Sequence, residues 1–224
     1  MASTINTNTY SLNAQTNLAK NSLGLRSALE RLSSGLRVNS ARDDATGLAS
    51  GMQIEAASRI TQIEMRQEGD KISSAQIADG ALSVVGDIVT RIMELNKMGG
   101  GATEIGLLVT QASTIQTDAN AAITKFGGTS FTAIAVTSTA DATTLTSVST
   151  ARTTQGATMN NAEFAIQSKQ VSYENQQAAR SRIMDADFAE ETSRLSRFQI
   201  LQQAGTAMVA QANAIPQNVL TLLR

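Results

Sequence analysis

The sequence predicts a mainly α-helical protein, organised as a discontinuous bundle of long helices. Hydrophobic residues make up 42% of the chain, but aromatic residues make up only 3% and Trp is absent. A core must therefore consist of Ala, Leu, Ile, Val and Met, which suits thin helical bundles. The 224 residues include one proline, Pro216, and good helix formers dominate both the N-terminal and the C-terminal parts of the chain.

Apolar residues near both chain ends alternate in steps of three and four, which places them on one stripe of a helix. The N-terminal stripe, with Ser22 filling one position, consists of Leu18, Leu25, Leu29, Leu32 and Leu36. The C-terminal stripe consists of Phe198, Leu201, Gly205, Met208, Ala212, Ile215, Val219 and Leu222. Each stripe has the pattern of one side of a coiled coil, so each needs a partner.

Two kinds of partner fit these stripes. Most amphipathic helices pack on a globular core, which the residues between the chain ends would form. Because the stripes have similar length and lie at opposite ends, we expect them to pack on each other or on neighbouring copies of the chain. Gly205 supports this expectation, since a small residue lets two helix backbones approach closely although it costs about 1 kcal/mol of helix propensity.

Two inner helices are expected after the N-terminal stripe. Ser40 as N-cap, with Asp43 three residues later, predicts a helix that begins near residue 41 and ends at about Met98, before three glycines. Its apolar stripe is Ile77, Ala81, Val84, Ile88, Ile92 and Leu95. The second helix carries Ile105, Leu108, Ala112, Ile115, Ala119, Ala122 and Phe126. The two helices form an αα-hairpin.

Residues 129–144 differ in composition from the helical regions. They are rich in Thr, Ser and Ala and include Phe131, Ile134 and Val136, which predicts a small β-hairpin or loop near the midpoint. A last inner helix follows over 145–183, with a weak apolar face formed by Met159, Ala162, Ile166 and Tyr173. The chain thus runs out and returns, which brings both termini to the same end.

The composition argues against an enzyme. Cys and His are both absent, which removes thiolate and imidazole metal ligands and the usual general base near neutral pH, so we expect no catalytic residue, metal or cofactor. The acidic segment at 43–44, and the segment at 185–187 together with Glu190 and Glu191, are interpreted as helix N-termini rather than cation sites. A carboxylate-dependent hydrolase stays conceivable, but it would need paired acids in a pocket.

Charge and hydropathy exclude further classes. The net charge is −1 without a basic block, so the electrostatic pattern of a nucleic-acid-binding protein is missing. The N-terminus lacks the basic and apolar regions of a cleavable signal peptide, and no continuous apolar run approaches about 18 residues, so we expect no membrane insertion. These rules alone would predict a cytosolic protein.

Motifs at both ends resemble those of bacterial flagellin. The N-terminal motifs are SLNAQ (11–15), LERLSSGLRVNSA (29–41) and DDATG (43–47). The C-terminal motifs are ARSRIMDADFA (179–189), QILQQAG (199–205), PQNVL (216–220) and the final LR (223–224). The resemblance extends over nearly the full chain and implies a structural subunit of the bacterial flagellar filament.

The resemblance also implies a domain organisation. Residues 1–40 and 184–224 would be the two halves of an axial filament-core domain, and 41–128 and 145–183 the two parts of a rod-like helical domain. Residues 126–131 resemble the family's turn motif, and only the short 129–144 segment stands where other members carry outer domains. We therefore expect almost no variable outer domain. The Thr/Ser run from Thr129 to Thr154 is either O-glycosylated or simply a polar surface loop.

Partners follow from the same resemblance. They are further copies of the chain in a helical filament, hook–filament junction and cap proteins, and an export chaperone on the C-terminal segment. The family is exported unfolded through the flagellar type III channel and assembles at the filament tip, which predicts a secreted, extracellular protein despite the missing signal peptide. Alternatives are a hook–filament junction protein and a soluble coiled-coil adaptor.

Two surfaces resemble sites that host innate immune receptors read. The first lies within residues 90–95 and retains Arg91, Glu94 and Leu95 of the surface bound by the Toll-like flagellin receptor, whereas Met93 and Asn96 differ from the family's usual Arg and Ala. The second is the tail sensed by inflammasome receptors, represented by Val219, Leu220, Leu222, Leu223 and Arg224. The same tail residues are also expected to pack in the filament core.

Overall fold

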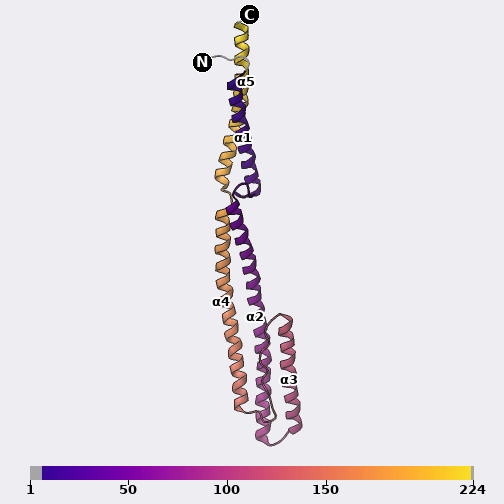
Figure 1. Ribbon diagram of the computed structural model, residues 1–224. Helices are drawn as coiled ribbons and strands as arrows, with labels where there is room; N and C mark the ends of the chain where they lie inside the picture. The colour runs from indigo at the N-terminus through magenta and orange to yellow at the C-terminus, as the bar shows by residue number, and fades with distance from the viewer. Residues whose placement is uncertain (1–6, 223–224) are drawn as a thin grey trace. The chain divides into compact units, whose positions relative to one another are not determined.

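The computed structural model describes residues 7–222, with side chains described for residues 7–214. Its helices are α1 (Thr9–Ser34), α2 (Ala45–Met98), α3 (Ala102–Lys125), α4 (Ala142–Met184) and α5 (Phe188–Leu222) (Figure 1). The chain divides into two compact units. We call Met1–Glu55 with Gln177–Arg224 the terminal unit, and Ala56–Gln176 the inner unit. The predicted mainly helical class is confirmed.

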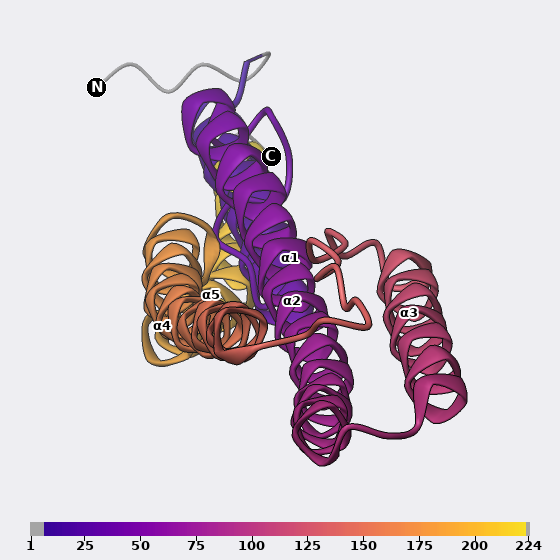
Figure 2. The ribbon, with the colours of Figure 1, turned by 90° about the horizontal axis from the view of Figure 1, so that it is seen from below.

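The core of the inner unit lies along α2, where α3 and α4 flank this helix (Figure 2). Its largest fully buried side chains are Leu82, Val85, Val89 and Ile92 from α2 and Ile123 from α3. Phe131, Ala140 and Val148 complete the core from the following segment and from α4. As the composition predicts, most of these side chains are aliphatic.

For two residues of the predicted inner stripes, the expected burial is wrong. Val84 and Phe126 are exposed, whereas Leu82, Val85 and Ile123 are buried. In the inner unit α2 packs against two neighbours, so its apolar face is wider than a single stripe of three-four spacing and turns away from Val84. In α3 the stripe ends one turn earlier than Phe126, because the residues from Phe126 on form the turn that leaves the helix.

The predicted β-hairpin at 129–144 is not confirmed, since no strand occurs there in the described part of the chain. The segment is instead held by two side-chain amides of α3. Asn120 Nδ2 donates to the Phe131 carbonyl (3.2 Å) and Asn120 Oδ1 accepts from the Phe131 N–H (3.0 Å). Gln116 does the same for Ile134, at 3.1 Å and 2.6 Å. Because Gln116 and Asn120 are one helical turn apart, they replace the partner strand that a hairpin would supply.

Replacing Gln116 with leucine is expected to destabilise the inner unit by about 1–3 kcal/mol. Gln116 is buried, and the substitution leaves the N–H and C=O of Ile134 without their partners. Thermal unfolding followed by circular dichroism measures the effect. Gln111→Leu, at an exposed position of the same helix, is the matched control. Equal melting temperatures for the two variants would show that the amide pairing is dispensable.

The start of α2 also differs from the prediction. The helix begins at Ala45, and its N-cap is Asp44, whose Oδ1 accepts from the Gly47 N–H at 2.8 Å. Ser40, the predicted cap, instead belongs to a tight turn in which its N–H and hydroxyl both donate to Asp43 Oδ2. These hydrogen bonds lower the pKa of the Asp43 carboxyl. The chain offers two consecutive carboxylates, and the second one reaches the free N–H groups of the helix.

The longest helix has the length and composition of a membrane-spanning segment. An 18-residue window of α2 has a mean hydropathy of 1.2. The part of α2 in the inner unit supplies half of the buried residues in that unit's described hydrophobic core. Core formation is therefore sufficient to account for the apolar character of α2.

Candidate assembly site: the paired terminal helices

Helices α1 and α5 of the terminal unit pack side by side and run antiparallel (Figure 1). From Ser11 onwards, residue numbers fall along α5 as they rise along α1. The contacting pairs are Asn8 with Ala212, Ser11 with Asn213, Leu18 with Gly205, Gly24 with Phe198, and Arg31 with Glu191. The register is therefore the same along almost the whole of α1.

Two glycines set how closely these helices approach. A Cβ atom placed on Gly24 would lie 2.5 Å from Cζ of the Phe198 ring, closer than van der Waals contact allows. A Cβ on Gly205 would lie 3.1 Å from Cδ1 of Leu18. Each glycine thus leaves room for a large apolar side chain of the opposite helix, and the expected role of Gly205 in close approach agrees with this geometry.

Polar contacts hold the two helices together near the start of α1. Asn8 is the N-cap of α1, and its Oδ1 accepts from the Ser11 N–H at 3.1 Å. Its Nδ2 donates to the carbonyl of Ala212 at 2.8 Å. The buried hydroxyl of Ser11 donates to Asn213 Oδ1 at 2.7 Å. One residue therefore both starts α1 and attaches it to α5.

A buried carboxylate joins the helices near the other end of α1. Glu191 is only 4% exposed, and its Oε1 accepts from Arg31 of α1 at 3.2 Å and from Arg194 of its own helix at 3.3 Å. Burial of a carboxylate is unfavourable unless the group is paired and hydrogen-bonded. The guanidinium groups of Arg31 and Arg194 therefore make the buried position of Glu191 possible. Sequence reasoning assigned Glu191 only to the start of a helix and missed the ion pair.

Backbone hydrogen bonds join the segment that follows α1 to the connection between α4 and α5. Gly35 ends α1 with a φ of 71°, a left-handed conformation that favours glycine. Its carbonyl accepts from the Ala186 N–H at 2.9 Å, and the Arg37 N–H donates to the Met184 carbonyl at 2.7 Å. Asp187 then caps α5 by accepting from the N–H groups of Ala189 and Glu190. The acidic segment at 185–187 is a helix start, as predicted.

Only part of the predicted stripe lies between α1 and α5. Leu18, Phe198 and Gly205 are in contact there, and Leu25, Leu32, Leu36 and Leu201 are partly buried. Leu29 is 48% exposed and Met208 63% exposed, so neither is enclosed by the pair. The side chains of Ile215, Val219 and Leu222 lie outside the described residues. The assignment of the whole set to subunit assembly stays a prediction.

Large apolar side chains remain exposed on both helices of the pair. Leu23 on α1 is 64% exposed and Ile200 on α5 is 65% exposed; Leu12 also lies on the surface of α1. The three-four pattern did not identify them, because they lie off the main stripes. Both helices of the pair thus present large apolar side chains to solvent.

The two predicted receptor surfaces are described to different extents. Arg91 and Glu94 are exposed and pair at 3.2 Å, and Arg91 also pairs with Glu104 of α3 at 3.2 Å. Leu95 is buried in the inner core, so it is not part of that surface in the folded unit. Leu220 and Leu222 lie in α5 without described side chains, and Leu223 and Arg224 lie outside the described residues. Receptor recognition at either surface stays a prediction.

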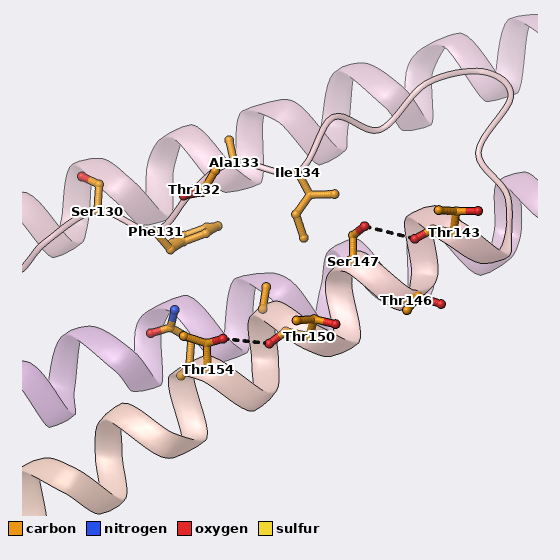
Figure 3. A pocket seen from close by; sticks show the side chains of 12 residues that line it. Ser130, Phe131, Thr132, Ala133, Ile134, Thr143, Thr146, Ser147, Thr150 and Thr154 are labelled. Atoms are coloured by element: carbon orange, nitrogen blue, oxygen red, sulfur yellow. Dashed lines mark hydrogen bonds between the residues drawn. The ribbon is translucent and has the colours of Figure 1, made fainter.

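A groove in the inner unit has no catalytic arrangement. It has a volume of about 580 Å³ and lies between residues 130–134 and α4 (Figure 3). Its hydroxyls include Ser147 and Thr154, which donate to the carbonyls of Thr143 and Thr150, and its lining residues carry no acid or base. In the part of the chain that the structure describes, no cluster of three acidic side chains is arranged to hold a metal ion.

Comparison with known proteins gives matches over nearly the full chain. The bacterial flagellin N-terminal helical region matches residues 5–126, and the bacterial flagellin C-terminal helical region matches residues 136–223. A flagellin of Halalkalibacterium halodurans is 35% identical, over 98% of this chain and 99% of that protein. A flagellin of Xenorhabdus nematophila is 32% identical over the full length of both. A flagellin of Salmonella typhimurium is 38% identical over 69% of this chain but 33% of its own length.

Proposed function

The chain belongs to the bacterial flagellin family and is a structural subunit of the flagellar filament, not an enzyme; we propose that it polymerises through the outer faces of its α1–α5 pair. The two family regions are separated by only residues 127–135, which leaves little room for a variable domain. The terminal helices and the inner helices thus account for almost the whole subunit.

The observation that carries the proposal is the exposure of large apolar side chains along the helix pair. Leu12, Leu23 and Leu29 on α1 and Ile200 and Met208 on α5 are all about half exposed or more. Burying such side chains against neighbouring copies is favourable by roughly 25 cal/mol per Å² of apolar surface. Because the contact joins unlike surfaces on successive copies, it repeats without closing and produces a helical polymer.

The decisive test changes two of these side chains separately. Leu23→Asp and Ile200→Asp are each expected to raise the critical concentration for polymerisation more than tenfold, because a carboxylate would have to be buried in every contact. Both side chains point to solvent in the subunit, so helix content should not change. Pelleting of purified subunits measures the first effect and circular dichroism the second.

Gln203→Asp is the matched control, since it introduces the same charge at an exposed polar position of α5. It should polymerise close to normally. If Leu23→Asp and Ile200→Asp form filaments as readily as this control, the outer faces of the pair are not the assembly surface.

The wider assembly pathway is part of the same proposal. Family membership supports export in an unfolded state, addition at the distal tip beneath a cap protein, and attachment to hook–filament junction proteins. An export chaperone would bind the C-terminal segment before assembly, when the apolar side chains of α5 have no partner. Electron microscopy of purified subunits should show long filaments, whereas a junction protein would form only short oligomers.

A further inference from the structure

Met208 occupies an unusual place on the α1–α5 pair. The positions before and after it on the α5 stripe both touch α1: Gly205 faces Leu18, and the Ala212 carbonyl accepts from Asn8. Met208 shares their three-four spacing, yet its side chain is 63% exposed. The thioether therefore lies at the edge of the helix contact, open to solvent in the free subunit.

The other sulfur atoms provide an internal comparison. The chain has no Cys and eight Met, so methionine is the only residue whose sulfur can be oxidised. Met184 is buried, and its Sδ would lie 2.6 Å from a Cβ placed on Gly51. Met52 and Met98 are exposed, like Met208, but neither lies on α1 or α5. Exposure thus predicts oxidation at Met52, Met98 and Met208, with Met184 protected.

We propose that Met208 is an oxidation site at which a hydroperoxide controls subunit assembly; this inference rests on the proposed polymerisation through the α1–α5 pair. The thioether sulfur attacks one peroxide oxygen, the O–O bond breaks, and an S=O bond forms. Sulfur loses two electrons to give the sulfoxide, and the second oxygen leaves with its substituent, takes the one proton that the transferred oxygen releases and becomes an alcohol, or water when the substituent is hydrogen. With hydrogen peroxide, the products are methionine sulfoxide and one molecule of water.

The sulfoxide changes the chemistry of the assembly surface. It replaces an apolar, flexible side chain by a polar group with a strong acceptor oxygen. In the filament this oxygen would be buried without a donor, which is unfavourable at every repeated contact. In the free subunit it stays in water, so the fold of the subunit is unaffected. Oxidation therefore acts on assembly and not on folding.

The test compares two full-length variants that differ only at residue 208. The first is Met52→Leu with Met98→Leu, which leaves Met208 as the exposed thioether among the described residues. The second carries Met208→Leu in addition. Both are treated as monomers with hydrogen peroxide, the sulfoxide at each methionine is measured by peptide mass spectrometry, and the critical concentration for polymerisation is measured by pelleting.

Peroxide should raise the critical concentration of the first variant about tenfold and leave the second unchanged, and methionine sulfoxide reductase should restore assembly. Preformed filaments should show protection of Met208. If the oxidised first variant polymerises like its untreated form, the inference is wrong although the proposed function stands. If neither variant polymerises before treatment while the wild-type chain does, exposed methionines are needed for assembly itself and the oxidation proposal is rejected.

Discussion

Replacing Gly24 with valine is expected to abolish filament formation. A Cβ at this position would lie 2.5 to 3.0 Å from three atoms of the Phe198 ring, and valine adds two further methyl groups. Phe198 would have to leave the space between α1 and α5, which separates the helices along the middle of the pair. Overpacking of this kind costs about 1–3 kcal/mol within a core and is repeated in every subunit of a polymer.

A second substitution, on α5, shows whether the clash between the valine at position 24 and Phe198 causes the loss of filaments. In the double variant Gly24→Val with Phe198→Ala, the valine occupies the space that the ring left, so pelleting should recover at least in part. Gly80→Val is the control, because a Cβ there meets nothing within 4 Å and the residue lies in the inner unit. Normal filaments from Gly24→Val alone would contradict the antiparallel register described above.

Replacing Glu191 with alanine should weaken assembly about a hundredfold in critical concentration. The substitution removes the carboxylate that Arg31 and Arg194 share, and leaves Arg31 near the helix contact without its partner. Breaking a buried ion pair in this way costs about 3 kcal/mol, which corresponds to roughly two powers of ten. Sedimentation of purified subunits over a range of concentrations gives the value.

Glu190→Ala is the matched control for this experiment. Glu190 is exposed and pairs with Arg194 of its own helix. An exposed pair one helical turn apart contributes about 0.3–0.5 kcal/mol, so the critical concentration should change by about twofold. Equal effects of the two substitutions would show that Glu191 acts only through the charge of the α5 N-terminus and not by joining the helices.

The helices themselves were predictable, because their signals are local. Periodic apolar positions predicted α2 and α3, the glycine run after Met98 located the end of α2, and Asp187 lies in the acidic segment that is predicted to start a helix. The prediction of Ser40 as the N-cap of α2 was wrong, since the sequence contains several acceptors within five residues and only the folded turn decides which one caps the helix.

The partners of the helices were less predictable, because three-four spacing is the same whichever neighbour covers a stripe. It identified Leu18 and Gly205 but also Leu29 and Met208, which are exposed, and it passed over Gly24. A helical glycine carries no apolar signal, although a Cβ at Gly24 would lie only 2.5 Å from the Phe198 ring. The midpoint segment depends on Gln116 and Asn120, two amides on α3 that no strand pattern includes.

The central claim is that each subunit keeps α1 and α5 paired and uses the outer apolar side chains of this pair to bind its neighbours. Cryo-electron microscopy of filaments assembled from the purified chain tests it most directly. We expect Gly24 to face Phe198 within every subunit, and Leu23 and Ile200 to lie against neighbouring copies. A filament in which Leu23 and Ile200 still face solvent would contradict the claim.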